Sequence, residues 1–97
     1  MKKFKLMADF QCYPLWIISD VEAGDINPDI LPISASLKED LHKWAQKYNA
    51  TFNAEYPPDS GFPSAEAEIL FKKEGQSLRD RLQRELGDNY EIIYNLS

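Results

Sequence analysis

The strongest constraint on the fold is an abrupt change of hydrophobic period late in the sequence. Up to residue 86, apolar residues recur every three or four positions, as on one face of an α-helix. Gly87 follows, where a glycine commonly ends a helix. Residues 90–96 then alternate with period two, as in a strand. The pattern predicts a helix over 64–86, capped by Ser64, with a strand after it. The apolar line of this helix is Ala67, Phe71, Gly75, Leu78, Leu82 and Leu86, widened at its start by Ile69 and Leu70.

A second apolar stripe with helical spacing predicts a helix that begins near residue 34 and ends at Asn49. Either Ser34 or Ser36 can cap it, and Ser36 with Glu39 has the form of a capping box. Glu39 and Asp40 are then expected in the first turn, where the helix dipole favours them. The stripe consists of Leu37, Leu41, Trp44, Ala45 and Tyr48.

The remaining segments predict two further strands and two loops. Residues 3–10 alternate, residues 15–19 are a short β-prone run, and the turn between them suggests an antiparallel hairpin. Residues 20–33 and 50–63 show no sustained period and contain glycine and proline, so we expect loops. The predicted fold is α+β, one domain over residues 1–97, in the order ββααβ. Two helices would cover one face of a mostly antiparallel three-stranded sheet, with both tryptophans, Trp16 and Trp44, in the core.

Charge is distributed unevenly along the chain, and its distribution bears on the kind of partner. The net charge is −5, and residues 20–68 contain ten acidic side chains against three lysines. An acidic surface of this kind disfavours nucleic-acid binding and favours a basic protein partner.

No residue pattern indicates an enzyme, a metal site or a cofactor site. The only histidine, His42, lies beside the apolar stripe of a helix, and the only cysteine, Cys12, has apolar neighbours that predict a half-buried structural thiol. One histidine and one cysteine do not form a structural zinc site, and the acidic residues lack calcium-loop spacing. A single cysteine excludes an internal disulfide, and no apolar run reaches the length of a membrane span. We therefore expect a cytoplasmic protein that binds a macromolecule.

The candidate contacts with that partner lie in the two predicted loops. The first loop carries closely spaced carboxylates, and the second carries more apolar surface than a connector needs. Together they would form a charged rim with aromatic anchors, although the acids could equally be solvated and the aromatics folded into the core. The candidate residues are Asp20, Glu22, Asp25 and Asp29 in the first loop, and Glu55, Tyr56, Asp59 and Phe62 in the second.

Over nearly its full length the chain resembles small acidic immunity proteins of bacterial polymorphic-toxin and contact-dependent growth-inhibition systems. The resemblance implies a cytoplasmic protein that binds and neutralises a cognate toxin domain, usually basic and often a nuclease. It transfers no binding residue, because such interfaces differ between pairs. The alternative is a non-catalytic structural or regulatory accessory protein that forms a homodimer. The matching segments are Met7-Ala8-Asp9, Cys12-Tyr13-Pro14-Leu15-Trp16, Leu31-Pro32-Ile33-Ser34 with Leu37, Leu41, Trp44 and Tyr48, Ser60-Gly61-Phe62, Glu74-Gly75 with Leu78 and Leu82, and Glu85-Leu86-Gly87 with Tyr90 and Tyr94.

Overall fold

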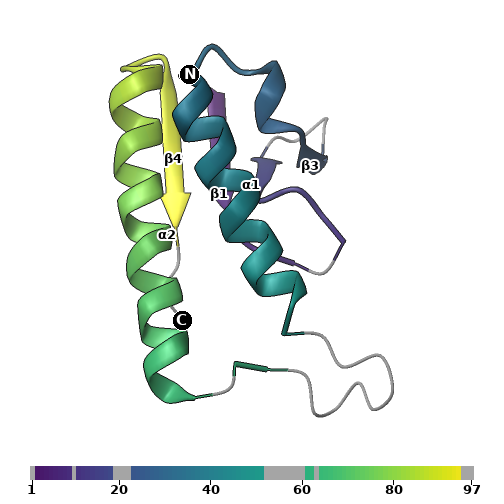
Figure 1. Cartoon of the computed structure of the whole chain (residues 1–97). Helices are drawn as coiled ribbons and strands as arrows, with labels where there is room; N and C mark the ends of the chain where they lie inside the picture. The colour runs from purple at the N-terminus through teal and green to yellow at the C-terminus, as the bar shows by residue number, and fades with distance from the viewer. Residues whose placement is uncertain (1, 10, 19–22, 52–60, 63, 95–97) are drawn as a thin grey trace.

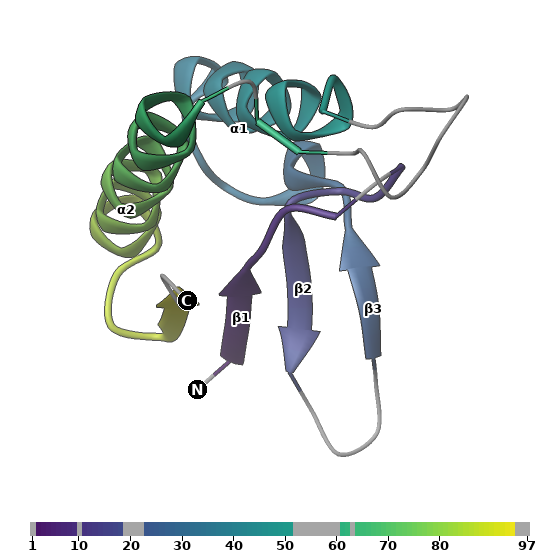
Figure 2. The ribbon, with the colours of Figure 1, turned by 90° about the horizontal axis from the view of Figure 1, so that it is seen from below.

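A computed structural model describes residues 2–9, 11–18, 23–51, 61–62 and 64–94 of the chain. Its fold is α+β, as predicted, with two long helices on the same side of a sheet (Figure 1). Viewed from below, α1 and α2 form one layer and the strands form the other (Figure 2). The elements in chain order are β1 (Lys2–Leu6), β2 (Leu15–Ile18), β3 (Ala23–Ile26), the 3-10 helix η1 (Pro28–Ile30), α1 (Ala35–Asn49), α2 (Ala65–Leu86) and β4 (Tyr90–Tyr94).

The sheet has four strands in the order β3-β2-β1-β4, so the prediction of three strands is wrong. The pairs β1–β2 and β2–β3 are antiparallel, whereas β4 runs parallel to β1. The strand that the sequence did not reveal, β3, lies in the predicted acidic loop. Its residues are Ala-Gly-Asp-Ile, and the first three types are depleted in strands. Local preference therefore gives no strand signal there, and pairing with β2 stabilises this segment instead.

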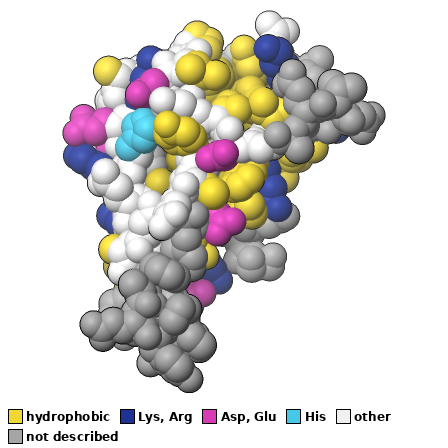
Figure 3. Space-filling view, turned by 90° about the vertical axis from the view of Figure 1, so that its right-hand side faces the viewer, with side chains coloured by type: hydrophobic (Ala, Val, Ile, Leu, Met, Phe, Trp, Pro, Cys, Tyr) yellow, Lys and Arg dark blue, Asp and Glu magenta, His cyan; other side chains and the backbone are white. Residues whose placement is uncertain are grey.

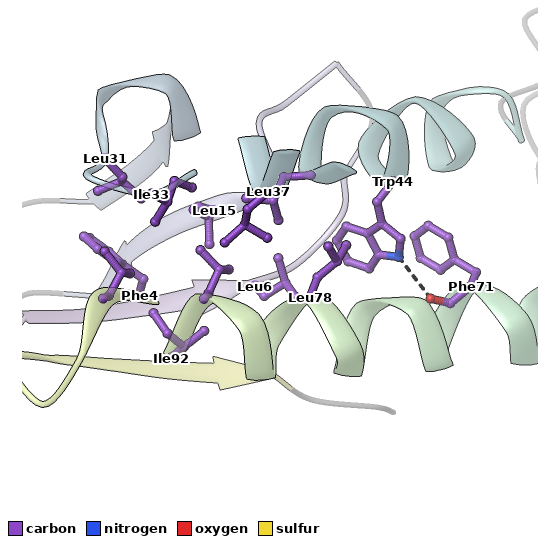
Figure 4. Close-up of a cluster of buried hydrophobic side chains, with 13 residues drawn as sticks. Phe4, Leu6, Leu15, Leu31, Ile33, Leu37, Trp44, Phe71, Leu78 and Ile92 are labelled. Carbon is purple, nitrogen blue, oxygen red and sulfur yellow. Dashed lines mark hydrogen bonds between the residues drawn. The ribbon is translucent and has the colours of Figure 1, made fainter. Parts of the chain in front are cut away.

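The core lies between the helices and the inner face of the sheet (Figure 4). Phe4, Leu15 and Ile92 come from three neighbouring strands and point toward the helices, as strand alternation requires. Both predicted apolar helix stripes are confirmed over most of their length, since each contributes several of its residues to one cluster. The buried hydrophobic residues of the cluster are Phe4, Leu6, Leu15, Leu31, Ile33, Leu37, Leu41, Trp44, Phe71, Leu78, Leu82, Leu86 and Ile92.

The two tryptophans lie in different environments. Trp44 is 1% exposed, stacks on Phe71 with 4.5 Å between ring centroids, and donates its indole N–H to the Phe71 carbonyl at 3.0 Å. Trp16 is paired with Lys5 across β1–β2, on the outer face of the sheet, and is only half-buried. Its Nε1 donates to the Met7 carbonyl at 3.0 Å. The prediction of a core position is confirmed for Trp44 and wrong for Trp16, because β2 alternation turns Trp16 away from the helices.

Helix α1 begins two residues earlier than the capping-box motif suggested. The Ser34 hydroxyl accepts the Leu37 N–H at 3.2 Å, so Ser34 is the N-cap and Ser36 lies inside the helix. This shift places Glu39 and Asp40 beyond the first turn. They are held by other side chains, described below, and the dipole argument for them was wrong.

Helix α2 has the predicted caps and the predicted buried line. Ser64 caps its start, and Gly87 follows its end with φ 80°, a backbone conformation that favours glycine. Gly75 is buried, as expected for close packing. Ile69 and Leu70 do not widen the buried stripe, because they are 52% and 61% exposed. Their helical positions face away from the sheet, which apolar character alone did not reveal.

Candidate partner interface

Most carboxylates on the two long helices have a lysine or arginine partner close by. Asp40 bonds Arg81 at 2.6 Å and Glu74 bonds Lys47 at 2.6 Å, so both pairs link α1 to α2. Within a helix, Glu39 pairs with Lys43 at 3.0 Å. Exposed pairs of this kind contribute little to stability, about 0–1 kcal/mol each. Their consequence for recognition is greater, because each carboxylate is neutralised locally by a cation.

Asp25 is held differently, by the backbone of a neighbouring connection. It lies on β3 opposite Trp16, and its Oδ2 accepts the Tyr13 N–H at 2.7 Å. The contact joins β3 to the connection between β1 and β2. The earlier interpretation of a solvated loop carboxylate is therefore wrong for Asp25, which contributes to the fold while its side chain remains exposed.

Asp29 lies on η1 and contacts the middle of α1. Its Oδ1 lies 3.0 Å from His42 Nε2, which forms an ion pair when the imidazole is protonated. The Asn27 side chain accepts the Asp29 N–H at 3.0 Å and so caps η1. His42 is half-exposed on the helix surface, as predicted, and its contact joins η1 to α1. Asp29 is 56% exposed, so its carboxylate remains accessible from outside.

Cys12 lies close to two of the aspartates. Burial raises the pKa of its thiol, and the negative charges of Asp25 and Asp9 raise this pKa further. Backbone contacts place both aspartates near this thiol, because the Cys12 N–H donates to the Asp9 carbonyl at 3.3 Å and Asp25 accepts from the next residue, Tyr13. We use the term acidic face for the surface that carries Asp9, Asp25 and Asp29.

Exposed hydrophobic side chains accompany the acidic face. Tyr13 is 42% exposed and directly follows Cys12, and Ile30 is 73% exposed beside Asp29 on η1. Figure 3 looks onto the side of the molecule that carries the histidine, and acidic side chains lie there among hydrophobic ones. Charged and apolar groups in this mixture are typical of a protein–protein contact surface.

The second predicted group of contacts has a different environment. The Phe62 ring lies 5.0 Å from that of Phe71 and 6.4 Å from that of Tyr48, measured between centroids. It therefore packs against the aromatic part of the core, as the alternative interpretation had it. Tyr48 lies in the last turn of α1 and His42 in the middle, about 9 Å apart along the helix axis. The structure thus holds Phe62 and Asp29 at different levels of α1.

Five of the predicted contact residues lie outside the described residues: Asp20, Glu22, Glu55, Tyr56 and Asp59. Sequence reasoning missed Tyr13, Ile30 and the contact of His42. A signal for η1 itself was present, since Asn27-Pro28-Asp29 is a typical start of a helical turn and would have placed Asp29 on a defined element.

Two structural tests concern metals and membranes. Within the described residues, no group of three or more histidine, cysteine, aspartate or glutamate side chains is arranged to hold a metal ion. Neither long helix, over the residues described, combines the length and apolar character that crossing a membrane requires. The acidic face therefore carries negative charge without the convergent geometry of a cation site.

The negative potential at Cys12 gives a direct prediction. We expect Asp25→Asn to lower the pKa of the Cys12 thiol, because the amide removes a charge and keeps an oxygen for the Tyr13 N–H. A larger thiolate fraction reacts faster, so alkylation by iodoacetamide at pH 8 should accelerate in this variant. Asp80→Asn, on α2, is the matched control and should leave the rate unchanged. Equal alkylation rates for Asp25→Asn and the unmodified protein would contradict the placement of the Asp25 charge close to the Cys12 thiol.

The model of a protein family described as "Serratia CdiI immunity protein-like" matches residues 2–97. A search of curated proteins finds no match to the chain.

Proposed function

Because the chain belongs to the Serratia CdiI immunity protein-like family, we propose that it neutralises a basic toxin domain of the nuclease type, and that its acidic face is the surface that docks. Membership of the family favours this role over that of an accessory protein. The toxin acts in the cytoplasm in this proposal, and the immunity protein meets it there. Covering the active site of the toxin, or a surface that it needs, is sufficient for inhibition, and no catalytic group or cofactor is required on this chain.

The observation that carries the proposal is the difference between the carboxylates of the helices and those of the acidic face. Asp40 and Glu74 each face a cation on the other helix. Asp25 is held by a backbone N–H, which carries no net charge, and Asp29 by an imidazole. Among the described residues, neither aspartate forms an ion pair with a lysine or arginine, a property that Glu85 on α2 shares, because it accepts from the Ser34 N–H and hydroxyl. Asp25 and Asp29 therefore keep negative charge on the same side of the protein as the exposed Tyr13 and Ile30. Potentials of this kind accelerate association with a basic partner and set its orientation.

The predicted contacts outside the described residues remain part of the proposal. Asp20 and Glu22 immediately precede β3 in sequence and would extend the acidic face. Glu55, Tyr56 and Asp59 form a second candidate contact segment. Phe62 is the least suitable anchor of the group, since its ring packs on Phe71, and truncating it would disturb the core as well as any complex.

The experiment that tests the proposal compares two double variants with the same change of charge. Asp25→Asn/Asp29→Asn removes two of the three negative charges that define the acidic face, and both amides keep a hydrogen-bond acceptor. The probe is the C-terminal domain of the protein encoded immediately upstream, and surface plasmon resonance gives the rate constants. We expect association to slow about tenfold at low salt and much less at high salt, because salt screens charges over about 8 Å at physiological ionic strength.

The control is Glu39→Gln/Glu74→Gln, which removes two charges from the helices. This control reduces the net negative charge by the same two units as the test variant but leaves the acidic face intact. We therefore expect it to associate with the toxin domain at a rate close to that of the unmodified protein. Thermal unfolding of both variants verifies that each is folded under the conditions used. If the control slows association as much as the test variant, net charge alone is responsible and the acidic face is not the docking surface.

A further inference from the structure

Beside the acidic face lies a hollow of about 310 Å³, between α1 and the connection from β1 to β2. Its volume is at the lower end of the range of ligand pockets in proteins. A space of this size suits one long side chain better than a whole element of a partner. Among its lining residues are Tyr13, Pro14, His42, Ala45, Gln46 and Asn49.

The base of the hollow is apolar and one wall is aromatic. Pro14 is fully buried and Ala45 is 7% exposed, so both present carbon atoms. The Tyr13 ring is 42% exposed and meets the His42 ring edge-on, with 6.3 Å between centroids. An apolar base suits an aliphatic stem, and an exposed aromatic ring suits a cation at its end.

Carboxylates adjoin both sides of this aromatic wall. Asp25 accepts the N–H of Tyr13 at 2.7 Å, and Asp29 contacts His42 at 3.0 Å. Cys12 also lines the hollow; burial raises the pKa of its thiol, and the negative charges of Asp25 and Asp9 raise it further. A cation in the hollow would therefore be attracted from two directions.

A second hollow on the molecule is alike in size but differs in its lining. It also measures about 310 Å³ and lies between α1 and α2. Lys43, Lys47 and Arg81 line it together with Asp40 and Glu74, and the two carboxylates are already paired with Arg81 and Lys47. A guanidinium entering this second hollow would therefore meet other cations, whereas no lysine or arginine lines the hollow beside the acidic face.

We propose that the hollow beside the acidic face is a socket for one arginine side chain of the toxin. The stem of the arginine lies along Pro14 and Ala45, and its guanidinium stacks on Tyr13 within reach of the aspartates. Arginine suits this site better than lysine, because a planar guanidinium stacks on aromatic rings and forms paired hydrogen bonds with carboxylates. The inference rests on the proposed function and names the chemistry of the contact at its centre.

The test places an arginine of the protein itself in the socket. Gln46 is exposed on α1 and lines the hollow, so Gln46→Arg supplies a guanidinium that competes with that of the toxin. We expect the Kd for the upstream-encoded toxin domain to rise about tenfold or more, mainly through faster dissociation, as for loss of a central anchor. Gln76→Arg on α2 is the matched control, because it adds the same charge and can keep the bond to Asp80, 3.1 Å in length. Its Kd should rise less than about threefold, as for other charges outside the contact centre.

A second pair of variants tests the aromatic wall. Tyr13→Leu removes the ring, whereas Tyr13→Phe keeps it, so the leucine variant should bind at least about fivefold more weakly than the phenylalanine variant. On the toxin, one arginine-to-lysine substitution should weaken binding to the unmodified protein and have little further effect on the Gln46→Arg variant.

The outcomes separate the two proposals. If the unmodified protein does not bind the toxin domain, the proposed function fails and the socket with it. If the unmodified protein binds, two results would each overturn the socket. One is an equal Kd for Gln46→Arg and Gln76→Arg, and the other is an equal Kd for Tyr13→Leu and Tyr13→Phe. In either case the acidic face remains the docking surface.

Discussion

Replacing Gly75 with leucine is expected to lower the free energy of unfolding by about 3 kcal/mol, the upper end of the usual cost of overpacking. A Cβ atom at Gly75 would lie 2.6 Å from Tyr94 Cζ and 2.7 Å from Trp44 Cζ2, and closer still to the Tyr94 hydroxyl. Contacts this short require a neighbour to move. Trp44 has little freedom to do so, because it is 1% exposed and stacked on Phe71. Urea unfolding followed by circular dichroism measures the change.

Alanine at the same position separates crowding from helix preference. In an exposed helix, glycine to alanine stabilises by about 1 kcal/mol. At Gly75 we expect destabilisation instead, because the first added carbon atom already overlaps Tyr94 and Trp44. Tyr94→Phe removes the nearest atom, so in the double variant part of the loss should be recovered, with a coupling of about 1 kcal/mol. A stabilising Gly75→Ala would show that this part of α2 is packed less tightly than the structure indicates.

The second large effect concerns Trp44, for which replacement by alanine should cost about 3–5 kcal/mol. The substitution removes the stacking on Phe71, the edge-on contact with Tyr94 at 6.1 Å, and the bond to the Phe71 carbonyl. Single domains have a total stability of about 5–15 kcal/mol, so this variant is expected to approach unfolding at room temperature. Thermal and urea unfolding by circular dichroism provide the measurement.

Trp16→Ala is the control for Trp44→Ala, because the chemical change is the same at a half-buried site on the outer face of the sheet. Its main specific loss is the bond to the Met7 carbonyl, about 1 kcal/mol. We expect Trp16→Ala to lower the free energy of unfolding by less than half as much as Trp44→Ala does. Equal losses from the two variants would mean that the outer face of the sheet is covered to the same extent as the core.

The parts of the fold that the sequence predicted are those in which local pattern and packing agree. The stripe of α2 from Phe71 to Leu86 has helical period, a serine at its start and a glycine at its end, and all of these indicate the same element. β3 is the opposite case, since Gly24 and Asp25 disfavour strands and only the pairing with β2 stabilises them. Ile69 and Leu70 show a third situation, in which apolar side chains next to a buried stripe are exposed because their positions on α2 face away from the sheet.

The candidate interface was predictable in its charge and not in its geometry. Asp25 and Asp29 were recognised as acidic residues without cations nearby in sequence, and that property remains the basis of the proposal. Their contacts with Tyr13 and His42 depend on pairing between segments 12 and 13 residues apart. No pattern along the chain encodes such contacts, because they follow from where β3 and η1 lie against the hairpin and α1. The hollow beside these two aspartates could not be predicted from the sequence for the same reason.

The parallel pairing of β1 with β4 has a consequence for the timing of folding. Lys2 is aligned with Tyr90, so β1 is made at the start of translation of this segment and its edge-strand partner β4 after both helices. Ribosomes add about 5–20 residues per second, which separates the two strands by several seconds. Until β4 emerges, one edge of β1 has no strand beside it and the core lacks Ile92. Contacts so distant in sequence also slow folding itself. The sheet and its core are thus complete only when nearly the whole of this segment has been synthesised.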